Sequence, residues 1–212
     1  AQIMSYRAFV DEGLRDLIAA PMSEEDKKSL RQLMELGLHH EQQHQELLLT
    51  DIKYNFGHNP LHPPLIESTG VANECSVLQR ALSFNDYEPG LVEIGALAGF
   101  CFDNELPRHR VYLAPFSLAN RLVTNEEYLA FMEDGGYHRP ELWLSEGWSH
   151  CQQQAWNHPL YWHWRDGEWC EYRFDGLHPL VSNAPVVHVS GYESAAFAAW
   201  SNARLPTEFE WE

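Results

Sequence analysis

The sequence predicts an α+β protein, with a helical part at residues 1–58, a linker at residues 59–90 and a mixed domain at residues 91–212. Residues 1–56 carry apolar side chains at helical spacing and contain a single proline, Pro21. From residue 91 onward, short strand-like pieces alternate with helix-start signals. Between these parts, prolines and glycines interrupt the chain at positions 57, 60, 63, 64, 70, 89 and 90.

Two helices are expected in the N-terminal part. Apolar side chains recur at helical spacing in residues 1–20, and Pro21 ends this pattern. Ser23 then occupies the N-cap position of a second helix that runs to about residue 56. The positions that share one side of this helix, and that we expect to be buried, are Leu30, Leu33, Leu36, His40, Gln43, His44, Leu47, Asp51 and Tyr54.

The C-terminal part has the signals of a domain with short elements. Strands are expected at residues 91–94, 110–113 and 186–189, and a short helix near residues 76–82. Three capping-box patterns predict helix starts at Thr124, Ser190 and Thr207, each with a glutamate three residues later. We expect an α+β arrangement in which much of the chain is irregular.

The charge of the chain restricts its partners. Its 14 basic and 31 acidic residues give a net charge of −17, so neither nucleic acid nor an anionic membrane is an expected partner. No apolar run has membrane-spanning length, and no signal peptide is recognised. The cysteines, Cys75, Cys101, Cys151 and Cys170, form no C-x-x-C pair, which favours reduced thiols in a cytoplasmic protein.

His40 and His44 are the most informative pair of residues in the chain. Four residues apart on a helix, their imidazoles lie on one face, one turn apart, where they can chelate a first-row transition metal. A helix that merely happens to carry histidines is the plain alternative. Burial of two imidazoles without partners would be unfavourable, however, and this favours a metal.

The same stretch also matches the pattern H-E-x-x-H of zinc peptidases, with Glu41 as general base. In that interpretation Glu67 or Glu74 would be the third ligand. Two glutamines lie between the histidines, where such peptidase helices usually carry apolar residues, and this argues against a peptidase.

A longer set of motifs resembles the ergothioneine-biosynthesis sulfoxide synthases, also called hercynine oxygenases. The first motif is the run at residues 36–53, which contains His40-x-x-x-His44-x-Glu46. The later segments that agree with this family are residues 102–105, 107–109, 123–126, 134–137, 142–145, 159–162 and 204–208. The resemblance therefore extends over essentially the whole chain.

This resemblance implies a partial DinB-like helical bundle followed by a domain like the formylglycine-generating enzymes, which have a C-type-lectin-like fold. It implies an Fe(II) cofactor held by three histidines, of which His40 and His44 match two, and it places Gln43 against the imidazole substrate. The implied reaction joins a thiol, from cysteine or γ-glutamylcysteine, to the imidazole of trimethylhistidine with O₂, and oxidises the sulfur. Glu46 points away from His44 on the helix and is expected to be structural.

The chain departs from the family pattern at both ends. The third iron histidine and the catalytic tyrosine have no counterpart here, so the chain is expected to be an inactive portion of a longer enzyme whose catalytic residues stay unknown. His58 and His62 are expected in loops, and His109 and His188 in structural roles. Six tryptophans at residues 143–169 are attributed to packing, with stacking on the trimethylammonium group as the alternative. An ovothiol-type sulfoxide synthase, a zinc metallopeptidase and a non-catalytic binding module stay open as other functions.

Overall fold

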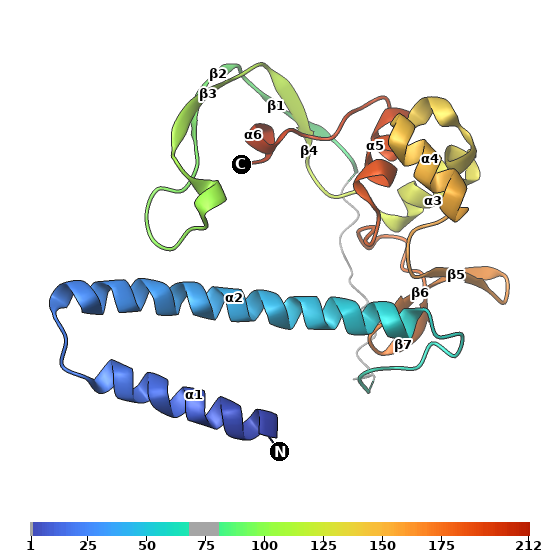
Figure 1. The fold of residues 1–212 in the computed structure, drawn as a ribbon. Helices are drawn as coiled ribbons and strands as arrows, with labels where there is room; N and C mark the ends of the chain where they lie inside the picture. The colour runs from blue at the N-terminus through green and yellow to red at the C-terminus, as the bar shows by residue number, and fades with distance from the viewer. Residues whose placement is uncertain (1, 68–80) are drawn as a thin grey trace. The chain divides into compact units, whose positions relative to one another are not determined.

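The structure is a computed structural model that describes residues 2–67 and 81–212 (Figure 1). The chain divides into two compact units, Ala1–Leu49 and Thr50–Glu212. Helices and strands occur together, which confirms the α+β class expected from the sequence. Among the described residues, no helix combines the length and the apolar character that crossing a membrane requires.

The first unit consists of α1 (Gln2–Ala19) and most of α2 (Glu24–Gly57), as the apolar spacing predicts. The backbone N–H of Asp26 donates to the Ser23 hydroxyl over 3.1 Å, so Ser23 acts as the expected N-cap of α2. Glu24, Glu25 and Asp26 place negative charge in the first turn, where the helix dipole favours it.

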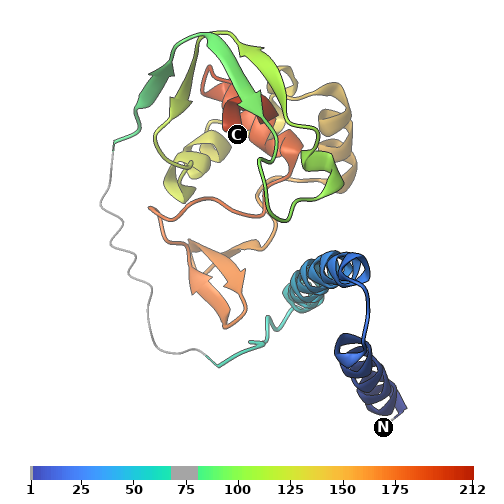
Figure 2. The same ribbon diagram turned by 90° about the vertical axis from the view of Figure 1, so that its left-hand side faces the viewer.

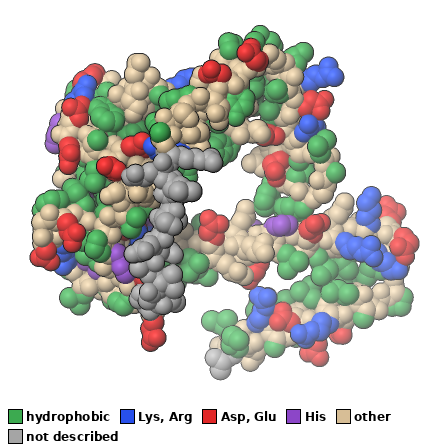
Figure 3. Space-filling model, turned by 180° about the vertical axis from the view of Figure 1, so that it is seen from behind, with side chains coloured by type: hydrophobic (Ala, Val, Ile, Leu, Met, Phe, Trp, Pro, Cys, Tyr) green, Lys and Arg blue, Asp and Glu red, His purple; other side chains and the backbone are tan. Residues whose placement is uncertain are grey.

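The expected burial of one side of α2 is not observed in this structure. No residue of α1 is buried, and in α2 only Gly57 is. Leu33 and Leu47 of the predicted stripe are 67% and 56% exposed, and His40, Gln43 and His44 are also exposed. Hydrophobic side chains are visible over the surface of these two helices in Figure 3. The reason is geometric, since one neighbouring helix covers too little of α2 to bury a stripe of this length.

The second unit contains three small antiparallel sheets. Their strands are β1 (Phe84–Tyr87), β2 (Gly90–Ile94), β3 (His109–Leu113), β4 (Phe116–Ala119), β5 (Trp162–Arg165), β6 (Glu168–Arg173) and β7 (Gly176–Pro179). β1 pairs with β4 and β2 with β3, while β5, β6 and β7 form a meander. The strands expected at residues 91–94 and 110–113 are confirmed as β2 and β3.

The strands differ from the sequence expectation in two places. β1 lies before residue 91, inside the stretch expected to be a linker, and already pairs with β4. Residues 186–189 form no strand, because the backbone of His188 has φ of 61°, which is incompatible with an extended strand. The short helix expected near residues 76–82 falls mainly on positions 76–80, outside the described residues; Ala81 and Leu82 are not helical.

The helices of the second unit are α3 (Asn125–Glu133), α4 (Ser145–Gln154), α5 (Gly191–Trp200) and α6 (Glu208–Trp211), with 3-10 turns at Asp103–Glu105, Gly136–His138 and Pro140–Leu142. All three predicted capping boxes are confirmed. Thr124, Ser190 and Thr207 each accept a hydrogen bond from the backbone N–H three residues later, at the starts of α3, α5 and α6.

The core of the second unit is rich in aromatic residues. α5 packs against both α3 and α4 (Figure 2). The buried residues of this cluster are Tyr128, Phe131, Tyr137, Trp143, Cys151, Trp162 and Ala196. The Tyr137 hydroxyl donates to the buried Glu193 carboxylate over 2.5 Å, and the Ser190 N–H donates to the same carboxylate over 2.7 Å. The glutamate that caps α5 therefore also satisfies a core tyrosine.

Candidate metal centre

Helix α2 brings the two predicted ligands together. The rings of His40 and His44 have centroids 4.6 Å apart and planes at 86° to one another. Their i, i+4 spacing on an unbroken helix is the cause, because residues one turn apart lie above one another on the same face. Both side chains are exposed, so a metal ion has access to them from solvent.

A complete ligand set does not occur within the part of the chain that the structure describes. Residues 2–67 and 81–212 contain no group of three or more His, Cys, Asp or Glu side chains placed to hold a metal ion. Of the acids considered for a peptidase site, Glu74 lies outside the described residues and Glu67 belongs to the second unit. Metal binding by His40 and His44 therefore stays a prediction.

Two residues between the histidines differ in their surroundings. Gln43 is exposed and precedes His44 by one position on α2. Glu41, the general base of the peptidase interpretation, lies 3.5 Å from Nη1 of Arg7 in α1. Glu41 is thus engaged in an ion pair with α1, which gives the peptidase interpretation no support.

The other histidines considered in the sequence have protein partners. His58 lies in the turn after α2, where its Nδ1 donates to the Tyr54 carbonyl over 2.8 Å, and His62 follows in the next turn. The His109 Nδ1 donates to the Pro107 carbonyl over 2.9 Å. The Nε2 of His188 lies 2.7 Å from the Lys53 ammonium nitrogen. These positions agree with the loop and structural roles expected for them.

His163 on β5 is a histidine for which the sequence predicted no role. Its Nε2 is buried and has no hydrogen-bond partner among the described residues, and its ring centroid lies 4.3 Å from that of His62. Burial, followed by the nearby His62, lowers the pKa of His163 to about 4. Nothing in the alternating pattern of a four-residue strand distinguishes such a histidine from an ordinary exposed one, so the sequence offered no signal for it.

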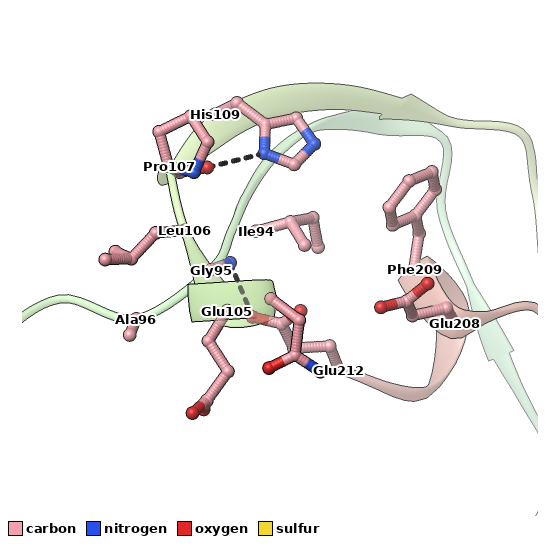
Figure 4. A pocket seen from close by; sticks show the side chains of 11 residues that line it. Ile94, Gly95, Ala96, Glu105, Leu106, Pro107, His109, Glu208, Phe209 and Glu212 are labelled. Atoms are coloured by element: carbon pink, nitrogen blue, oxygen red, sulfur yellow. Dashed lines mark hydrogen bonds between the residues drawn. The ribbon is translucent and has the colours of Figure 1, made fainter. Parts of the chain in front are cut away.

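A cavity of about 150 Å³ lies beside α6 and the ends of β2 and β3 (Figure 4). The Glu212 carboxylate accepts a hydrogen bond from the Gly95 N–H over 2.6 Å at its wall. His109 and Phe209 also contribute, with ring centroids 6.0 Å apart. None of the predicted site residues lines this cavity.

Most of the tryptophans serve packing. Trp143 and Trp162 are 7% and 1% exposed, and the Trp143 Nε1–H donates to the Gly136 carbonyl over 2.9 Å. Trp148, Trp156 and Trp169 pack against the same core. Trp164 differs, since it is 61% exposed on β5.

Comparison with known proteins defines the class. Residues 86–212 match the family described as Sulfatase-modifying factor enzyme 1-like domain, and the chain belongs to this family. It is also 33% identical to a hercynine oxygenase of Mycobacterium tuberculosis over 214 residues, which cover 100% of this chain and 48% of that protein. A hercynine oxygenase of Mycolicibacterium smegmatis is 36% identical over 84% of this chain and 40% of its own length.

These relatives confirm the similarity to the ergothioneine sulfoxide synthases that the motifs indicated. A formylglycine-generating enzyme of Streptomyces coelicolor is 33% identical over 54% of this chain and 40% of its own length. The chain spans about half the length, or less, of each of these curated relatives.

Proposed function

We propose that this chain is part of a non-haem Fe(II)-dependent oxygenase of ergothioneine biosynthesis, with His40 and His44 as iron ligands. The observation that carries the proposal is the similarity to a hercynine oxygenase across the entire chain, the His40–His44 helix included. Residues 1–58 would then be the partial DinB-like bundle and residues 91–212 the domain like the formylglycine-generating enzymes. The substrates would be trimethylhistidine, O₂ and a thiol from cysteine or γ-glutamylcysteine.

The residues present fit an iron ion. Neutral imidazole nitrogen is a good ligand for Fe(II), and a metal–nitrogen distance of about 2 Å is compatible with two rings whose centroids are 4.6 Å apart. Their exposure leaves the free side of the pair open for substrate and for a further ligand. When bound, iron with O₂ would supply the oxidising equivalents for forming the carbon–sulfur bond and the sulfoxide.

Gln43 would bind substrate rather than metal. An amide oxygen is a poor ligand for Fe(II) beside two imidazoles, whereas a primary amide both donates and accepts hydrogen bonds. Gln43 would orient the imidazole of trimethylhistidine next to the metal, an interaction of about 1–3 kcal/mol where water is excluded.

The first test is metal binding by three variants of this chain. We expect weak Fe(II) binding by the wild type under anaerobic conditions, measured by titration calorimetry. His44→Ala should reduce the affinity for Fe(II) at least about tenfold. Removing a residue that only supports a ligand already lowers metal affinity by about that factor, and removing the ligand itself should lower it no less. Gln43→Ala should bind iron like the wild type, and His39→Ala, on the same helix, is the matched histidine control.

Two results would contradict the assignment. Unchanged iron affinity in His44→Ala would remove the metal-site proposal, and equal loss in Gln43→Ala would make Gln43 structural. Turnover is then assayed on the intact natural protein with trimethylhistidine, each thiol and O₂. There, Gln43→Ala should retain iron but raise the KM for trimethylhistidine.

A further inference from the structure

The last turns of α2 make an unusual contact within the second unit. The Lys53 ammonium nitrogen lies 2.7 Å from Nε2 of His188 and 4.7 Å from the centre of the Tyr161 ring. An ammonium group has three donors and no acceptor, so Nε2 must accept this hydrogen bond. The His188 ring is therefore neutral in this arrangement, with its proton on Nδ1.

Tyr161 connects this contact to the end of the helix. Its ring meets the His188 ring edge-on, with centroids 4.8 Å apart. Tyr161 also abuts Gly57, where an added Cβ would lie 2.7 Å from a ring carbon. Only glycine fits at this position of α2, so the last turn of the helix, the tyrosine and the histidine form one packed group.

The backbone around this group is strained. Tyr161 has φ of 73° and His188 has φ of 61°, and both are non-glycine residues in the left-handed region. The Leu160 N–H donates to the His188 carbonyl over 3.2 Å, which ties the two strained segments together. Such conformations persist only where the surrounding structure determines them, and they concentrate at sites that have a role beyond stability.

Several charges surround the pair. Burial is the largest influence on Lys53 and lowers its pKa, with Glu171 opposing and Arg173 reinforcing the shift. Burial also lowers the pKa of His188, the Lys53 charge lowers it further, and Glu171 opposes both. Other titratable side chains also lie here: Tyr54 and Tyr172 near Tyr161, and the rings of His58 and His62, whose centroids are 4.1 Å from Tyr54 and 5.8 Å from Tyr172.

We propose that Lys53 and His188 form a proton-sensitive clasp, which holds the last turns of α2 while His188 is neutral and opens when His188 takes up a proton. Protonation turns Nε2 into a donor, so two donors and two positive charges would face each other over 2.7 Å. The hydrogen bond is then lost, and the strained segments at Tyr161 and His188 lose the contact that fixes them.

The clasp acts on the helix that carries the candidate metal centre. Helix α2 runs unbroken from Glu24 to Gly57, and Lys53 follows His44 by nine positions. Nine residues are about two and a half turns, so Lys53 projects from the side of the helix opposite His44. The clasp thus shares no residue with the proposed ligands, and the inference holds whether or not iron binds.

The direction of the pH dependence follows from the histidine. In the folded chain the pKa of His188 lies below the usual histidine value of about 6.5. The closed clasp therefore binds fewer protons than the open one, and opening becomes more favourable as the pH falls below about 6.5. One proton changes the opening equilibrium by at most about tenfold per pH unit.

Hydrogen exchange of the amides at residues 50–57 tests the clasp, after correction for the intrinsic pH dependence of exchange. Between pH 7.5 and 5.5, wild-type protection should fall by up to about tenfold. In Lys53→Met the fall should be less than about threefold, and the pKa of His188, followed by NMR, should rise. Lys28→Met, at an exposed position of the same helix, should behave like the wild type.

A second variant covers the case in which Lys53→Met does not fold. In His188→Asn, asparagine tolerates the left-handed backbone but cannot titrate, so the pH response of residues 50–57 should disappear. Acid effects that arise at His163 stay the same in every variant. A wild type without a pH response, an unchanged response in either clasp variant, or a His188 pKa at or above 6.5 would each overturn the proposal.

Discussion

The two ends of α2 illustrate two ways in which sequence determines structure. Up to residue 49, the helical structure of α2 is explained by local signals, namely an N-cap, an acidic first turn and apolar spacing. None of the residues in this part is buried. The last turn, by contrast, is fixed by packing, because buried Gly57 abuts Tyr161 and Lys53 contacts His188. Ligand-type residues lie in the first environment, and residues held by packing and by contacts with other segments lie in the second.

This difference has a consequence for function. His40, Gln43 and His44 are exposed, so their chemistry depends on what binds them rather than on a prebuilt cavity. In the second unit, several polar side chains already have partners within the fold, as the Tyr137–Glu193 and Lys53–His188 contacts show. The candidate ligands of the first region are therefore accessible from solvent, whereas these polar side chains of the second are engaged within the fold.

Two tryptophans on strand β5 give the largest expected difference in stability between a packed and an exposed side chain. Trp162 and Trp164 lie two positions apart on β5, and they are 1% and 61% exposed. Trp162→Ala should lower the free energy of unfolding by about 3–5 kcal/mol, since it leaves a cavity in the aromatic core. Trp164→Ala should cost less than about 1 kcal/mol. Urea denaturation of both variants measures this, and similar losses would show that β5 is not packed as described.

The same contrast explains what the sequence could and could not predict. Both helices of the first unit and the three capping boxes were predictable, because their signals lie within a few residues. The left-handed backbone at His188 and the pairing of β1 with β4 depend on contacts with distant segments, which no local pattern contains. The i, i+4 histidine pair was found because its spacing is a local signal, as it is for the helices. Partly buried His163 was missed because its surroundings come from distant segments.

Two glycines of α2 provide a smaller but more selective test. Among the described residues, no atom beyond the neighbouring helix backbone lies within 4 Å of a Cβ added at Gly37, whereas the Cβ at Gly57 would lie 2.7 Å from Tyr161. Gly37→Ala should raise the free energy of unfolding by about 0.5–1 kcal/mol, because alanine favours helix and restricts the unfolded chain. Gly57→Ala should lower it by about 1–3 kcal/mol through overpacking. Thermal unfolding of the two variants should therefore show changes of opposite sign, and changes of the same sign would contradict the anchored helix end.

The last comparison concerns two arginines, one in each unit. Arg121 donates to both carboxylate oxygens of Glu127, over 2.8 and 2.7 Å, and their side chains are only 23% and 30% exposed. Glu127 also accepts from the Thr124 N–H at the start of α3, so Arg121→Met removes a partner from a helix cap and should cost about 1–2 kcal/mol.

Arg7, 62% exposed, contacts Asp11 and Glu41 at the surface of the first unit, where solvent screens such pairs; Arg7→Met should cause no measurable change. Acid titration adds a second readout for Arg121. The guanidinium lowers the pKa of Glu127 to about 2, so this carboxylate contributes stability above pH 4.5 that is lost as the pH falls toward 2. That loss should shrink in Arg121→Met and persist in Arg7→Met. An equal acid response in both variants would show that the Arg121 pair is as weakly coupled to folding as the exposed one.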